Sequence, residues 1–531
     1  MKRLLFIIIA IPGLLLQSGC KKFLEEESLD EIRPATLQDL VALMASEGYP
    51  YQTSLTQVME ILTDDVQCNG GQAQASYVTV VKKGRAPYTW SKDMFEELLL
   101  PDGFTSTTYV NSWQILYNKI AGCNTVLGHL DKVTGDAGPK NNLRGQALAM
   151  RAYYYFLLVN MFGKPYNAPG SDPETSPGVP LKLRMEVTDS LYPRNSVAEV
   201  YRQIETDLKD GASLMEANPQ NNRVYKINEL AAYTLLSRVY LYQEKWDDCI
   251  TYANKVIAKK PGLTQLGTFK GPIPGGYYMY NNGTTYSYSN RIYDPLLSPE
   301  ILWTYTPIGN LSGGDEVFQS GGNPSYSNTL NPPYSVSAEL LALYDARPLA
   351  DTGIYLADLR SRVYLQSSSY LIGIISFNPL IINFGVKFTC GSAGMGGVGL
   401  RIAEDYLNRA EAKIQKAIKA GGNPTLLQEA LNDLNTLRIS RYDTRMPYVQ
   451  VSITDAQELL SFCRDERRRE FPFDGHRWFD LRRYGMPSIS HFYEENTGTG
   501  QTFTLAKGDS RYTLPIPKAV LQRNAMLTQN P

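Results

Sequence analysis

Two glutamates near the carboxyl end of the chain, Glu466 and Glu470, have the spacing of an acid–base pair. With Leu459 and Cys463 they recur every three to four residues, which places all four side chains on one face of a predicted helix. Paired carboxylates can act as general acid and base. However, seven arginines accompany five acids between residues 464 and 483, and guanidinium groups keep carboxylates ionised. We therefore expect buried structural ion pairs here, not catalysis. The arginines that follow nearby are Arg477, Arg482 and Arg483.

A glycine motif, Gly394-Met-Gly396-Gly-Val-Gly399, fits the GxGxxG pattern of dinucleotide-binding loops. A strand-like segment at 384–388 precedes it and a predicted helix follows. A dinucleotide site also needs a second parallel strand after that helix, with an acidic residue for the ribose. In this chain the helix is followed by Gly421-Gly422 and a further helix. The sequence therefore predicts a flexible glycine loop and no nucleotide cofactor.

Histidines and cysteines are too scattered to predict a metal site or a disulfide scaffold. The three histidines, His129, His476 and His491, lack ligand spacing, and no two cysteines form a CxxC pair. Five cysteines lie beyond the amino-terminal segment: Cys68, Cys123, Cys249, Cys390 and Cys463. Cys123, Cys249 and Cys463 lie in helical patterns, where cysteine most often behaves as a small buried hydrophobe. We expect no metal and no cofactor.

Aromatic residues gather in three places and suit the binding of sugars. Rings on loops offer flat apolar faces to the C–H face of a sugar, and neighbouring amides and guanidinium groups can bind its hydroxyls. We expect Trp113 and Trp246, which lie in helical patterns, to be core residues. The alternative for the other rings is that they too fill the core or stabilise loops. The predicted ligand-binding residues are Trp90, Tyr278, Tyr280, Asn282, Tyr286, Tyr288, Arg291 and Trp303.

The amino terminus has the pattern of an export signal. Lys2 and Arg3 precede the uncharged run 4–16, which is too short to span a bilayer as a helix. The following Ser-Gly-Cys resembles a bacterial lipobox, so we expect residues 1–19 to be removed and Cys20 to be lipidated. Gln17 departs from the usual aliphatic residue of that motif. The alternative is an ordinary cleaved signal with a chance cysteine.

The elements that carry these residues are predicted to be mainly helices. Segment 196–215 begins with a capping box, Ser196 with Glu199, and Thr454 with Gln457 suggests another before 454–484. The predicted helices are 143–162, 196–215, the pair 227–243 and 245–259, and the pair 400–420 and 424–440. The pairs resemble tetratricopeptide hairpins without a regular 34-residue repeat. Between them, residues 262–399 are rich in Gly, Pro, Asn, Ser and Tyr, which indicates a long loop-rich and functional region.

Composition excludes some partners. The 531 residues carry a formal charge of −1, so no overall positive field favours nucleic acid. The hydrophobic content of 43% is too high for a disordered chain.

Several motifs together resemble the SusD/RagB family of outer-membrane nutrient-binding lipoproteins. They are the lipobox, CKKFLEEE at the start of the mature chain, LRGQALAMRAYYYFLLVNMFG, LRIAEDYLNRAEA, and ERRREFPFDGHRWFDLRR at 466–483. The resemblance implies one mainly α domain over 20–531, in which tetratricopeptide-like hairpins at about 143–260 and 400–440 support an irregular, partly β ligand face. It also implies a surface-exposed lipoprotein that captures an oligosaccharide and delivers it to a SusC-like TonB-dependent transporter.

Two alternatives remain open from the sequence. The same architecture could capture peptides, which an acidic or basic pocket in place of a ring platform would favour. A surface glycoside hydrolase would need two carboxylates roughly 5–10 Å apart in a cleft. Sequence spacing identifies no such pair, so we expect a binding protein and not an enzyme.

Overall fold

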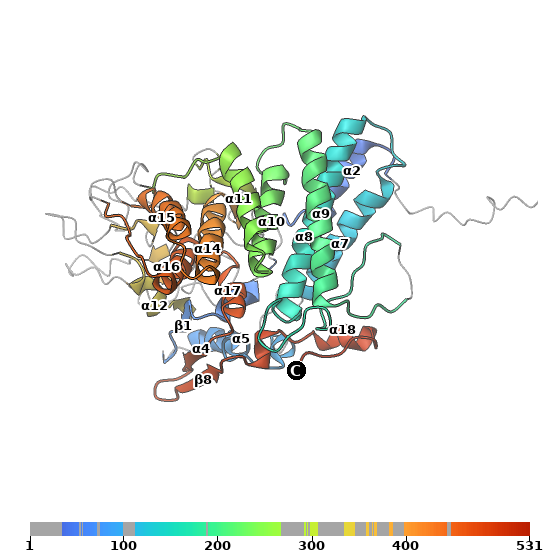
Figure 1. Cartoon of the computed structure of the whole chain (residues 1–531). Coiled ribbons are helices and arrows are strands. Elements are labelled where there is room, and N and C mark those ends of the chain that lie inside the picture. The colour runs from blue at the N-terminus through green and yellow to red at the C-terminus, as the bar shows by residue number, and fades with distance from the viewer. Residues whose placement is uncertain are drawn as a thin grey trace, which may run out of the picture.

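Helices packed side by side form most of the molecule in the computed structural model (Figure 1). The structure describes residues 34–51, 55, 57–71, 75–98, 112–186, 190–266, 291–293, 295, 298–305, 334–345, 357–360, 364, 366–368, 382–385, 398–442 and 448–531. The predicted signal peptide, Cys20 and most of the predicted loop-rich region 262–399 lie outside these residues. The domain boundaries therefore stay a prediction.

The central helices form a row in which each packs on the next. The row runs through α7 (Ser112–His129), α8 (Ala137–Phe162), α9 (Val197–Ala217), α10 (Glu229–Tyr242), α11 (Trp246–Lys259), α14 (Ala403–Lys419) and α15 (Pro424–Ile439). Each predicted helix is present, with ends that differ by a few residues. The long gap in sequence between α11 and α14 closes in space, because these two helices are direct neighbours.

Helix ends follow the local chemistry of the sequence. Ser196 caps α9 in the predicted capping box with Glu199. Asn423 caps α15 with Pro424 in its first turn, as the Gly421-Gly422 break before it suggests. The second predicted capping box is wrong by one residue. The side chain of Asp455, not that of Thr454, accepts the free N–H groups of α16 (Ala456–Glu470).

Short elements from both ends of the chain lie together beneath the helix row (Figure 1). The strand pairs are antiparallel: β1 (Val66–Cys68) with β3 (Tyr334–Val336), β2 (Ile301–Tyr305) with β6 (Val398–Arg401), β4 (Gln366–Ser368) with β5 (Ile382–Gly385), and β7 (Ile489–Tyr493) with β8 (Gln501–Leu505). The remaining α-helices of the described residues are α2 (Leu37–Leu43), α3 (Gln57–Ile61), α4 (Ala75–Lys83), α5 (Arg85–Tyr88), α6 (Met94–Glu97), α12 (Ala338–Ala342), α17 (Arg477–Arg483) and α18 (Lys518–Arg523).

The GxGxxG segment ends in β6, and its last glycine has a structural role. Gly399 has a φ of +153°, and a Cβ at this position would lie 2.1 Å from the carbonyl oxygen of Trp303 on β2. Only glycine allows the two strands to approach this closely. The pair is antiparallel, so β6 does not begin a parallel βαβ unit.

The buried hydrophobic residues form a large cluster that contains Cys123 and Cys249, and a smaller one among α14, α15 and α16 that contains Cys463. Cys123, Cys249 and Cys463 have no exposed surface and form no disulfide. Burial raises the pKa of the Cys123 and Cys249 thiols to about 12, so these groups stay neutral. Trp113 and Trp246 are also buried, as predicted.

Candidate functional site

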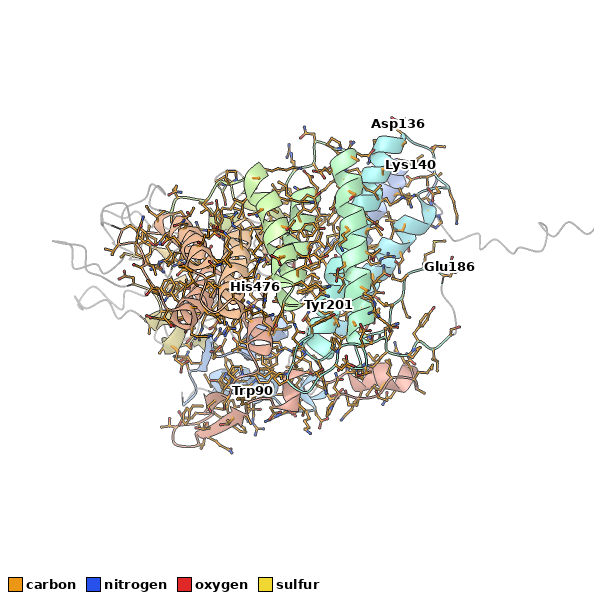
Figure 2. The ribbon with its side chains drawn as sticks, viewed as in Figure 1. Trp90, Asp136, Lys140, Glu186, Tyr201 and His476 are labelled. Carbon is orange, nitrogen blue, oxygen red and sulfur yellow. The ribbon has the colours of Figure 1, made fainter. Side chains whose placement is uncertain are left out.

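Two tryptophans predicted to bind ligand are core residues instead. Trp90 is 1% exposed, donates from Nε1 to the Leu62 carbonyl at 2.9 Å, and stacks on His491 with ring centroids 4.2 Å apart. Figure 2 shows it in the lower layer, beneath the helix row. Trp303 has no exposed surface and packs edge-on against Tyr153. The prediction was wrong for both rings, because tertiary packing buries short segments that look like exposed loops in the sequence.

The other predicted ligand residues cannot be placed in the same way. Arg291 begins the 3-10 helix η4 (Arg291–Tyr293), and its side chain is outside the described part of the chain. Five more lie in the segment 267–290, also outside the described residues. They are Tyr278, Tyr280, Asn282, Tyr286 and Tyr288, and they stay a prediction.

Glu466 and Glu470 lie fully buried within a network of arginines. Glu466 accepts from Arg360 and Arg469, each at 2.8 Å, and also from Arg438. Burial alone would raise the pKa of the Glu466 carboxyl, but the surrounding guanidinium groups lower it to about 2. This group stays ionised at neutral pH and cannot serve as a general acid.

Glu470 is held in the same way by different residues. Its carboxylate accepts from Arg401 Nη1 at 2.7 Å, from Arg441 Nη2 at 2.9 Å and from the Tyr364 hydroxyl at 3.0 Å. Arg441 and Arg401 keep the Glu470 pKa far below its usual value despite complete burial. The predicted structural role of both glutamates is confirmed.

The predicted arginine partners of these glutamates were wrong. Arg477 pairs with Asp64 at 2.7 Å, and Arg483 pairs with Glu411 at 2.8 Å. Arg482 has no ion pair within the described chain; its Nη2 donates to the Gly163 carbonyl. The break between α16 and α17 turns these arginines toward other elements. Apart from Arg469 on the same helix, the arginine partners of Glu466 and Glu470 come from more distant segments.

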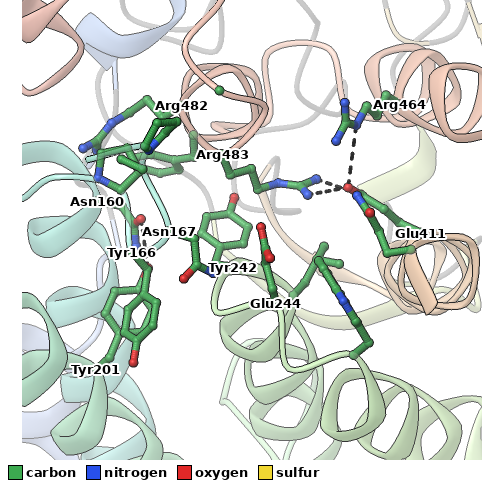
Figure 3. Close-up of a pocket in the computed structure, with 18 residues that line it drawn as sticks. Asn160, Tyr166, Asn167, Tyr201, Tyr242, Glu244, Glu411, Arg464, Arg482 and Arg483 are labelled. Carbon is green, nitrogen blue, oxygen red and sulfur yellow. Dashed lines mark hydrogen bonds and ion pairs between the residues drawn. The ribbon is translucent and has the colours of Figure 1, made fainter. Parts of the chain in front are cut away.

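A pocket lies where α8, α9, the α10–α11 turn, α14, α16 and α17 meet (Figure 3). Its polar lining includes Asn160, Tyr166, Asn167, Tyr242, Glu244, Glu411, Gln415, Arg464, Arg482 and Arg483. Its free volume is about 50 Å³, room for only a few water molecules. A whole sugar ring does not fit without a change in shape.

Ion pairs and ring contacts link the residues of one wall of this pocket. Arg483 makes a two-point ion pair with Glu411, at 2.5 and 2.8 Å, and its guanidinium lies over the Tyr242 ring at 5.3 Å. Arg464 lies over the Tyr484 ring at 4.0 Å. Arg483 and its neighbouring arginines lower the Glu411 pKa to about 2 although the group is buried. Glu411 is therefore a fixed anion here.

The sequence pattern does not predict this pocket as a site. Its arginines belong to the segment 464–483, where arginines outnumber acids. That surplus was the available signal, but the turn and helix ends that complete the pocket come from distant parts of the chain.

Within the described residues, no group of three potential metal ligands is close enough to hold an ion. The same part of the chain contains no helix with the length and apolarity required to cross a membrane.

Family models match both ends of the chain. One, described as "Starch-binding associating with outer membrane", matches residues 22–241, and one described as "SusD family" matches residues 394–531.

Curated relatives agree with these matches. The chain is 24% identical over 439 residues to a SusD-like protein, P38, from Formosa agariphila. This aligned region covers 75% of this chain and 76% of that protein. It is 34% identical over 131 residues to the starch-binding protein SusD of Bacteroides thetaiotaomicron, which covers only 24% of this chain and 20% of that protein.

Solved structures share the fold over nearly the full length. A SusD superfamily protein from Bacteroides thetaiotaomicron has a TM-score of 0.61 and 22% identity, covering 94% of this chain and 100% of that chain. A SusD-like carbohydrate binding protein from Bacteroides vulgatus has a TM-score of 0.62 and 19% identity, covering 93% and 98%.

The fold is therefore that of a mainly helical protein and resembles solved SusD superfamily structures. The sequence matches over residues 22–241 and 394–531 support a SusD/RagB family protein, and one of the two matching models is described as starch-binding and associated with the outer membrane.

Proposed function

We propose that this chain is a glycan-binding lipoprotein that is anchored through Cys20 at the cell surface and passes oligosaccharides to a SusC-like TonB-dependent transporter. The observation that carries the proposal is the family match described as starch-binding and outer-membrane associated. The fold agrees with it, since a likeness to SusD superfamily structures extends over 94% of the chain.

The proposed ligand face is the tyrosine-rich segment that includes Tyr278, Tyr280, Asn282, Tyr286, Tyr288 and Arg291. Trp90 and Trp303 are no longer part of this proposal, because both rings are buried. Tyrosine rings can stack on sugars while their hydroxyls reach water or ligand.

A glycan array followed by calorimetry tests the ligand class, using the purified full-length chain in detergent. We expect saturable binding of an oligosaccharide. Changing Tyr280 and Tyr288 together to alanine should weaken that binding at least about tenfold, since each stacked ring contributes on the order of 1 kcal/mol.

Phe492→Ala is the matched control, because this ring is 53% exposed but lies on β7, outside the proposed face. Unchanged affinity in the tyrosine variant would reject the face. Binding of peptides in place of sugars would reject the glycan ligand.

We also propose that the chain does not cleave its ligand. Its two conspicuous glutamates, Glu466 and Glu470, are ionised and inaccessible, which makes them unsuited to acid catalysis. Prolonged incubation with the bound oligosaccharide should release no new reducing ends. Measurable turnover by the purified protein would contradict this proposal.

A further inference from the structure

Several buried N–H donors around the pocket of Figure 3 have no acceptor. Within the described chain, no hydrogen-bond partner reaches Trp246 Nε1, Arg464 Nε, or Nε and Nη1 of Arg482. Arg464 Nε lies 4.0 Å from Oε1 of Glu411, beyond hydrogen-bond distance. Buried donors are nearly always paired, so this concentration of unpaired donors indicates a missing acceptor.

Arg482 also carries a charge that no acid balances. It is 2% exposed, and its one hydrogen bond in the described chain is from Nη2 to the Gly163 carbonyl. The charged groups that line the pocket are three arginines and two glutamates, Glu244 and Glu411. Three arginines against two glutamates leave one positive charge in excess, and Arg482 is the arginine among them that has no ion pair in the described residues. Burial without an acidic partner lowers the Arg482 pKa to about 10, but the group remains cationic at neutral pH.

Arg194 shows that a missing acid alone does not define such a site. It too is partly buried and has no ion pair in the described residues, but its N–H groups reach five oxygen acceptors. These belong to Phe162, Pro177, Gly178, Thr528 and Asn530. The donors of Arg194 are satisfied by the protein itself, whereas Nε and Nη1 of Arg482, a residue that lines the pocket, have no acceptor in the described residues.

We infer that this pocket binds an oxyanion, a carboxylate or sulfate group carried by a ligand, with Arg482 supplying the charge and Trp246 and Arg464 supplying further donors. Oxyanions present several acceptors at once, which matches a cluster of donors without acceptors. The free volume of about 50 Å³ suits one such group, with the remainder of the ligand outside. This site is separate from the proposed tyrosine-rich face and does not depend on it.

Calorimetry at constant ionic strength tests the inference, using the full-length chain in detergent with sodium sulfate, sodium glucuronate and glucose. We expect saturable one-to-one binding of at least one anion and none of glucose. Tighter binding of glucuronate would indicate an acidic sugar as the source of the oxyanion, and tighter binding of sulfate would indicate a sulfate group. No saturable binding of either anion would overturn the proposal.

Variants locate the bound anion. Arg482→Met should weaken binding about ten- to a hundredfold, the effect of losing a charged hydrogen bond, and Trp246→Phe about two- to tenfold. Arg194→Met is the matched control and should leave affinity unchanged. If Arg482→Met does not fold, two other measurements test whether the anion binds in this pocket. They are the affinity of Trp246→Phe and an anion-induced shift of the Arg482 Nε–H signal in NMR. Retained affinity in Trp246→Phe together with an unshifted Arg482 signal would overturn the assignment.

Discussion

At the scale of single residues, charge and burial act together in ways that a side chain's type does not reveal. Glu466 and Glu470 resemble a catalytic pair in sequence, yet both lie fully buried among guanidinium groups. Breaking a buried ion pair leaves the remaining charge without compensation, which costs about 3–5 kcal/mol. These glutamates therefore stabilise the fold.

Acid should weaken the fold through Glu466. Its pKa falls from 4.5 in the unfolded chain to about 2 in the folded protein, so the unfolded state binds more protons between these values. The stabilisation is complete above about pH 5 and is lost as the pH falls toward 2, by about 3 kcal/mol in total. Thermal unfolding followed by circular dichroism from pH 7 to pH 2 measures this loss.

The variant Glu466→Gln should unfold at lower temperature at pH 7 and show a smaller decline in stability with acid. Glu458→Gln, an exposed position on the same helix, is the matched control and should behave like the unchanged protein. Equal pH profiles for Glu466→Gln and the unchanged protein would contradict the role assigned to this carboxylate.

At the scale of elements, capping residues and hydrophobic spacing in the sequence predict where the helices lie. They do not predict as well which helices pack on one another. Asn423 and Pro424 begin α15 as predicted, because capping and backbone preference act within one turn. The capping error at 454–455 has the same local origin: threonine and aspartate are adjacent, and aspartate is at least as good a cap.

The β2–β6 pair gives a test of an element held by one glycine. Gly399→Ala should lower the melting temperature for two reasons. The added Cβ would clash with the Trp303 carbonyl oxygen, and alanine is strained at the positive φ of this position. Gly170→Ala is the matched control, since Gly170 has a φ of +70° and no atom within 4 Å of an added Cβ. The control should cost about 1 kcal/mol from backbone strain alone, and Gly399→Ala should cost more. Similar melting temperatures for both variants would show that the close approach of the strands is unimportant.

At the scale of the whole molecule, the row of helices brings α14 onto α11 and so joins parts of the chain separated by the predicted loop-rich region. The pocket of Figure 3 depends on this arrangement, because its walls come from segments between residues 160 and 485. A region can thus be inserted between the helix pairs without interrupting the scaffold.

Membrane attachment is also a property of the whole molecule. If Cys20 carries the lipid anchor, Cys20→Ala should move the protein from the membrane fraction to the soluble fraction of fractionated cells, because acyl chains supply the attachment. Cys68→Ala is the control, as this cysteine is half-buried within the fold. Membrane retention of Cys20→Ala would contradict the predicted lipid anchor.

The sequence alone determined the helices, their principal ends, the buried cysteines and the family. These depend on spacing of three to four residues, on capping chemistry and on motifs, all of which are local. Only the tertiary structure decided that Trp90 and Trp303 are buried and that Arg360, Arg401 and Arg441 rather than Arg477 surround the paired glutamates. It also decided that Nε and Nη1 of Arg482 have no acceptor within the described residues. The physical reason is that burial and ion pairing depend on which distant segments meet, and single-sequence patterns do not contain that information.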